Sequence, residues 1–197
     1  MQTAKWTISV WAAAGLLLVG CQAPTEAAGD TIPAFAEVTV TGDVLPEFQD
    51  PTVDGAVGVA APVLSGIGLD GETVDVTPGT EPEVVLFVAH WCPHCQEEIP
   101  TLVDWLAGND PVANLTVVAT GTDPLRPNFP PGEWLRSEGL EVPIILDDQA
   151  GTAGQAYGLT AYPFWVAIGS DGTVLGRISG GLSADDVGTL FAAVAGS

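Results

Sequence analysis

The feature that most constrains the fold is an apolar run that leads directly into two cysteines, "EVVLFVAHWCPHC" at residues 83–95. An uninterrupted run such as "EVVLFVA" is typical of a strand that is buried on both faces of a sheet. From Cys92 to about Ala107 the spacing becomes helical, because Ile99 and Leu102 fall on the same side. The sequence therefore places two thiols, three residues apart, where a buried strand gives way to a helix.

Strands and helices alternate along most of the remaining chain. A hairpin is predicted at "APVLSGIGLDGETVDV", around an Asp-Gly turn. Further strands are predicted at 115–120, 143–148, 163–169 and 173–180, and further helices at 130–139, 150–158 and 183–195. This order predicts an α/β domain over residues 58–197, in which helices flank a central sheet that starts with a β-hairpin.

Two thiols at the start of a helix suggest redox chemistry. Unpaired N–H groups and the helix dipole favour the thiolate form of Cys92. Cys95 lies one turn further on, so we expect Cys92 to attack a substrate and Cys95 to resolve the mixed disulfide. Pro93 fits the first helical turn, where its missing N–H donor costs nothing. An imidazole at His94 would stabilise the thiolate, and a more stable reduced form makes the disulfide a stronger oxidant.

The first twenty residues are predicted to be an export signal. Lys5 precedes an apolar run at residues 8–19, which suits a secretory signal but is shorter than the roughly 20 residues that span a bilayer. The next residues, "LVGC", resemble the bacterial lipoprotein signal, in which the cysteine is lipidated. This resemblance implies a lipid anchor at Cys21 on the extracytoplasmic face of the bacterial cell membrane. A generic signal peptide with an incidental cysteine is the alternative.

Residues 21–57 are predicted to be a flexible tether, because they are rich in Ala, Pro, Thr, Gly and acids. The stretch "AEVTVTG" favours a short strand, but no partner for it is evident nearby in the sequence. If Cys21 carries lipid, Cys92 and Cys95 remain as a pair. An extracytoplasmic compartment permits that pair to oxidise to a disulfide.

The charge balance excludes some partners. The chain has 25 acidic residues against 4 basic ones, and so acidic a surface repels nucleic-acid phosphates and anionic lipid head groups. Beyond position 20 the basic residues are Arg126, Arg136 and Arg177. They are too dispersed to predict an anion site.

The chain resembles the thioredoxin superfamily from about Gly58 to Ala195. The resemblance rests on "WCPHC" after an apolar strand, on Pro100 within the following helix, and on "AYPFWVAIG", in which Pro163 matches the family's cis-proline. The hairpin and the "LDD" after a strand resemble the TlpA-like extracytoplasmic branch. The family likeness implies a three-layer sandwich with a mixed sheet and a redox disulfide between Cys92 and Cys95.

The same resemblance implies a role for each neighbour of the cysteines. Trp91 and Tyr162 are expected to line a substrate groove beside Pro163, with simple packing as the alternative for Trp91. The implied partners are exported protein thiols and disulfides, together with a membrane redox partner that recycles the enzyme. No cofactor and no resident metal are expected.

Two departures from the family pattern leave questions open. The family often has a buried acid six residues before the first cysteine, but this chain has Leu86 there. Glu97 and Glu98 are expected to be solvated acids of the first helical turn, with a contribution to proton transfer from the resolving thiol as the alternative, and His90 a partly exposed polar residue. The CPHC motif resembles the DsbA class of oxidases, whereas many TlpA-like proteins are reductants, so the direction of electron flow stays open.

Two other functions are open to the cysteine pair. In the first, Cys92, Cys95 and either His90 or His94 bind a soft ion such as Cu(I) in a metal-delivery lipoprotein. In the second, the disulfide is purely structural. The loop that it closes is very short and would constrain the unfolded chain little.

Overall fold

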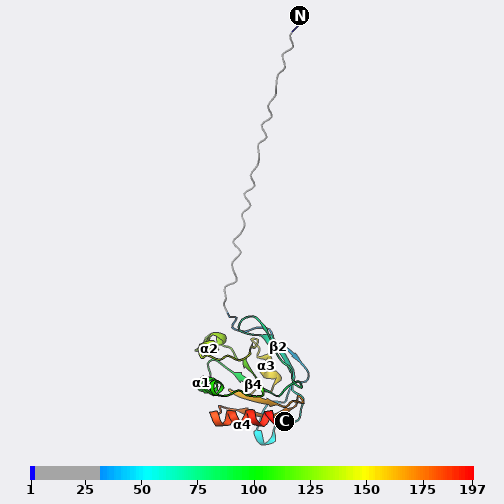
Figure 1. The fold of residues 1–197 in the computed structure, drawn as a ribbon, viewed down its shortest axis with the longest axis vertical. Helices are drawn as coiled ribbons and strands as arrows, with labels where there is room; N and C mark the ends of the chain where they lie inside the picture. The colour runs from blue at the N-terminus through cyan, green and yellow to red at the C-terminus, as the bar shows by residue number, and fades with distance from the viewer. Residues whose placement is uncertain (3–31) are drawn as a thin grey trace.

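The computed structural model describes residues 1–2 and 32–197 (Figure 1). The predicted signal peptide, apart from Met1 and Gln2, and the predicted lipidation site Cys21 lie outside the described residues. Within the described residues, no helix has both the length and the apolar character needed to cross a bilayer.

Eight strands of residues 32–197 form one mixed sheet in the order β1-β2-β6-β5-β4-β7-β8, with β3 paired to β2. The strands are β1 (Thr39–Thr41), β2 (Val63–Ile67), β3 (Thr73–Val76), β4 (Glu83–Val88), β5 (Asn114–Ala119), β6 (Ile144–Leu146), β7 (Phe164–Ile168) and β8 (Val174–Ser179). The helices are α1 (Pro93–Gly108), α2 (Pro131–Ser137), α3 (Thr152–Ala156) and α4 (Ala184–Ala195), with a 3-10 turn, η1, at Pro51–Val53.

Strand β4 lies near the centre of this sheet. It runs parallel to β5 and antiparallel to β7, while β5 is in turn parallel to β6. All six of its residues are buried, as expected for a strand covered on both faces. The predicted hairpin forms between β2 and β3. The predicted fold class, an α/β sandwich with a central mixed sheet flanked by helices, is therefore confirmed.

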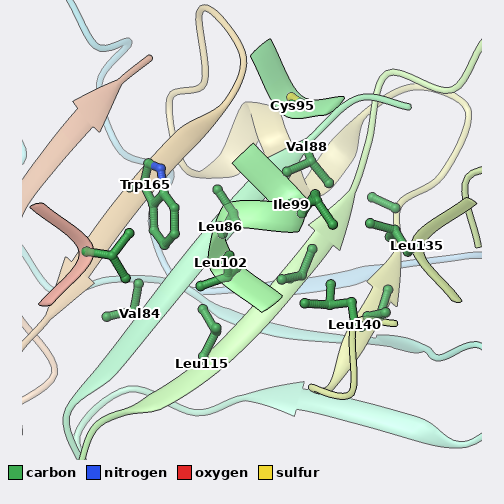
Figure 2. Packing of buried hydrophobic residues seen from close by; sticks show 14 of the residues in the cluster. Val84, Leu86, Val88, Cys95, Ile99, Leu102, Leu115, Leu135, Leu140 and Trp165 are labelled. Carbon is green, nitrogen blue, oxygen red and sulfur yellow. The ribbon is translucent and has the colours of Figure 1, made fainter. Parts of the chain in front are cut away.

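Alternate residues of β4 serve two separate cores. Leu86 packs in a cluster with residues of α1, α2 and α4, and Figure 2 shows Ile99 and Leu102 of α1 lying against this face of β4. Phe87 packs on the opposite face with residues of α3 and of the segment before β2. The sheet therefore has helices on both sides, and α1 is fixed over β4 by its apolar side.

The prediction of a flexible tether through residue 57 is wrong for residues 32–57. Strand β1 pairs antiparallel with β2. The partner that the sequence did not reveal is therefore β2, the first strand of the predicted hairpin. Three apolar side chains of this segment, Val38, Leu45 and Phe48, are buried against the second face of the sheet. The segment belongs to the folded domain because these side chains cover a face that α3 alone leaves open.

A buried ion pair also ties this segment to the sheet. Arg177 of β8 binds the carboxylate of Asp54 with Nε and Nη2, and its Nη1 donates to the carbonyls of Pro46 and Tyr157, at 2.8 Å each. Both charged side chains are almost fully buried. The guanidinium holds the pKa of Asp54 below its ordinary value. Arg177 is therefore a structural residue that joins three segments.

Candidate active site

The two cysteines lie where β4 leads into α1. Cys92 is the N-cap residue of α1 and Pro93 is its first residue, so the predicted helix start is confirmed. Both cysteines are free thiols. Cys92 retains 7% exposure, whereas Cys95 has none. The sulfur that is expected to attack is thus the outer one, and the sulfur that is expected to resolve lies behind it.

Pro163 lies opposite this thiol pair, as the sequence predicts. The Tyr162–Pro163 peptide bond is cis, and the Cys92 thiol donates to the carbonyl oxygen of Tyr162 at 3.6 Å. Tyr162, which the family resemblance expects to line a substrate groove, thus lies beside the outer thiol. Long-range folding, rather than the helix alone, brings Tyr162 and Pro163 to Cys92.

Trp91 forms one wall beside Cys92. Its indole N–H donates to the carbonyl of Gly121 at 2.8 Å, and its ring meets Tyr162 edge to face with centroids 5.7 Å apart. The guanidinium carbon of Arg126 lies 4.7 Å from the centre of the same ring. Gly121 has a φ of 60°, and a β-carbon there would overlap the Tyr162 hydroxyl. Only glycine fits this close approach.

His90 is buried, so the expectation of a partly exposed residue is wrong. Its Nδ1–H donates to the carbonyl of Pro127 at 2.6 Å, and its Nε2 accepts from the backbone N–H of Asp123 at 3.2 Å. Its own carbonyl accepts from the side-chain amides of Gln96 and Asn128. Both ring nitrogens are used, since the loop between β5 and α2 folds over this residue. His90 joins that loop to the start of α1.

His94 lies on the outside of α1. Its side chain is 73% exposed, and Glu97 is its charged neighbour, with Nδ1 and Oε2 3.8 Å apart. The described residues contain no cluster of three or more side chains of the kind that bind a metal ion. Both ring nitrogens of His90 are bonded to backbone groups. The ligands left for the soft-metal alternative are therefore Cys92, Cys95 and the exposed His94. The stabilisation of the Cys92 thiolate by His94 remains a prediction.

Glu98 is buried, and the expectation that it is solvated is wrong. Its side chain is only 3% exposed. Oε2 accepts from the backbone N–H of Leu182 at 2.7 Å, whereas the buried Oε1 has no hydrogen-bond partner. Burial raises the pKa of Glu98 to about 7. A helical period did signal this position, because residues 95, 98, 99 and 102 form the buried side of α1.

The environment of the Cys95 thiol is dominated by burial, with a smaller contribution from Glu98. Burial raises the pKa of the Cys95 thiol, and the neighbouring charges of Cys92 and Glu98 raise it further. Leu86, at the position of the family's usual acid, is fully buried and apolar. The carboxylate that acts on Cys95 is therefore on α1, at Glu98, and not on β4 at Leu86.

The larger of two cavities in residues 32–197 is not the one beside the cysteines. The larger cavity, about 950 Å³, surrounds the buried Glu83 at the opposite end of β4 from Cys92. A smaller one of about 430 Å³ adjoins the site, where Thr120, Gly121 and Tyr162 are part of its lining. Of these two cavities, the smaller one is therefore the one that shares Tyr162 with the thiol site.

The fold and the dithiol at the start of α1 define an oxidoreductase of the thioredoxin-like class. Comparison then gives the family: the Redoxin profile matches residues 27–193, and the chain belongs to that family.

Several solved structures of thiol–disulfide oxidoreductases are similar to this chain. DsbF from Mycobacterium tuberculosis, seen in mixed oxidised and reduced forms, is 25% identical over 66% of this chain and 93% of its own, with a TM-score of 0.55. A secreted M. tuberculosis disulfide oxidoreductase homologous to E. coli DsbE is also 25% identical, over 66% and 94%, with a TM-score of 0.56. A thiol:disulfide interchange protein from Chlorobium tepidum, 22% identical over 73% and 99% with a TM-score of 0.58, supports the fold alone.

Proposed function

We propose that this oxidoreductase is anchored to the extracytoplasmic face of a bacterial membrane and exchanges electrons with exported protein thiols and disulfides. The observation that carries the proposal is the pairing of an outer thiol, Cys92, with the Tyr162 carbonyl at the cis-proline. A substrate chain that lies along this carbonyl brings its own sulfur to the one thiol of the pair that is not fully buried.

The proposed exchange has two steps when the substrate is a disulfide. The Cys92 thiolate attacks one substrate sulfur, the substrate S–S bond breaks, and the released thiolate takes a proton. Cys95 then loses its proton and attacks the Cys92 sulfur, which breaks the mixed disulfide. The products are the Cys92–Cys95 disulfide and a reduced dithiol, so two electrons pass to the substrate. The reverse sequence oxidises a dithiol.

Glu98 is proposed to accept the proton of Cys95 in the second step. A general base works best when its pKa is near the working pH, and burial gives Glu98 such a value, about 7. Its Oε1 has no other hydrogen-bond partner, so it is available to take a proton. Glu98 thereby takes the place of the acid that is absent at Leu86.

The location of the enzyme is part of the proposal. The sequence supports an export signal and lipidation of Cys21, and one similar structure is that of a secreted oxidoreductase. A lipid anchor would hold the enzyme beside the membrane redox partner that regenerates its dithiol or disulfide. An oxidising compartment is also where protein disulfides persist as substrates.

Trapping of the mixed disulfide tests this function. In Cys95→Ser, Cys92 can still attack a substrate but the second step is blocked, so covalent complexes with exported proteins should accumulate. They are measured as bands on non-reducing gels that disappear on reduction. The control is Cys92→Ser, which should trap nothing because Cys95 is fully buried. Absence of reducible complexes with Cys95→Ser would overturn the proposal.

A further inference from the structure

Within residues 32–197, one basic residue has no acidic partner. Of the four basic residues in the sequence, three lie within residues 32–197. Arg136 pairs with Asp70 at 2.6 Å, and Arg177 pairs with Asp54. In that part of the chain no carboxylate lies within ion-pair distance of the exposed Arg126. It is the one cation there that is free to bind an anion from outside.

Arg126 lies next to the proposed redox site. Its guanidinium carbon is 4.7 Å from the centre of the Trp91 ring, and that ring packs edge to face on Tyr162. The Tyr162 carbonyl in turn contacts the Cys92 thiol. The Trp91 ring and then Tyr162, through its ring and its backbone carbonyl, therefore connect the guanidinium to the sulfur.

The loop that carries Arg126 is fixed in place. The backbone N–H of Arg126 donates to the carbonyl of Asp123 at 3.1 Å, and the Asp123 carboxylate is turned toward the backbone N–H of Leu125 at 2.9 Å. The buried His90 ring holds the loop at Asp123 and Pro127. Leu125, the residue before Arg126, is 92% exposed. The loop thus presents a positioned charge with an apolar neighbour.

We propose that Arg126 is a specificity residue that binds a carboxylate close to the target cysteine of the substrate. This inference rests on the proposed function and names its substrate class: protein segments in which Asp or Glu flanks the reacting cysteine. A guanidinium suits this task because its planar fork matches both oxygens of a carboxylate. The remaining surface is strongly acidic and repels such segments except at this point. A single positive charge on an acidic surface determines how an acidic substrate segment is aligned more than how tightly it binds.

The test uses disulfide-linked model peptides that differ only beside the cysteine, with Glu or Gln at that position. The second-order rate constant of Cys92 attack is measured for each peptide by stopped-flow tryptophan fluorescence. Relative to wild type, the Glu/Gln ratio of rate constants should fall about fivefold in Arg126→Gln, the range of an exposed but well-oriented ion pair. Arg136→Gln removes the same charge from a distant exposed pair and should leave the ratio unchanged.

Charge reversal supplies a second arm of the test. Arg126→Glu should favour a Lys-flanked peptide over the Glu-flanked one, and 0.5 M salt should reduce both preferences, since exposed charges are screened. Equal Glu/Gln ratios in wild type and Arg126→Gln would overturn the inference while the redox function stands. A wild-type enzyme that reacts with none of the peptides would instead overturn the redox function, and this inference with it.

Discussion

Glu98→Gln should slow the resolution of the mixed disulfide by about 100-fold, at the low end of what a general base contributes. The glutamine side chain has the same shape and can still accept the hydrogen bond from the Leu182 N–H, but it cannot take the proton of Cys95. Single-turnover mixing of the reduced enzyme with a disulfide peptide separates the two steps. Attack by Cys92 should stay within about twofold of the wild-type rate, because Glu98 acts only in the second step.

The pH dependence of the resolution rate distinguishes the loss of a general base from misfolding of the Glu98→Gln variant. The carboxylate is the active form, so the wild-type resolution rate should rise as the pH rises through about 7, where Glu98 ionises. In Glu98→Gln this inflection should disappear. The matched control is Glu97→Gln, which removes the same charge from the adjacent, exposed position. A wild-type profile with no inflection near 7, or an equal loss in Glu97→Gln, would contradict the role of Glu98.

Asp54→Ala should destabilise the fold by about 3–5 kcal/mol, the range for loss of one partner from a buried ion pair. The Arg177 guanidinium would remain buried with only two carbonyls as partners, so its charge would be uncompensated. Urea unfolding followed by tryptophan fluorescence measures the change. Asp70→Ala breaks the exposed pair with Arg136 and should cost at most about 1 kcal/mol.

The Asp54–Arg177 ion pair also predicts that the folded protein loses stability at acidic pH. Because the pKa of Asp54 is lower in the folded protein than its ordinary value, the stabilisation is present above about pH 4 and is lost as the pH falls further. Asp54→Asn should therefore lose less stability than wild type between about pH 4 and pH 2. Parallel acid profiles for the two proteins would show that the pair does not carry this dependence.

The sequence predicted the parts of the fold that local patterns determine. The buried strand β4, the helix start at Cys92 and the hairpin each have a short-range signal in apolar spacing or turn chemistry. The cis-proline at Pro163 came from resemblance rather than from spacing. Its approach to Cys92 depends on the sheet order, which brings β7 beside β4.

The residues that prediction missed are those whose surroundings come from distant segments. His90 and Glu98 look like ordinary polar residues in the sequence, and only the loop after β5 and the backbone at Leu182 show that they are buried and partnered. The pairing of β1 was missed for the same reason. The sequence favours a short strand there, but its partner is an edge of β2, which lies more than twenty residues further along the chain.

The bonds of His90 have a consequence for how partners bind. The imidazole and the carbonyl of His90 hold the Arg126 loop against the first turn of α1. This loop, which is proposed to recognise the substrate, is therefore ordered before a partner protein binds. Association then needs no ordering of that loop, and a preorganised surface avoids this entropic penalty. Good and poor substrates should differ mainly in residence time, since related complexes differ chiefly in their dissociation rates.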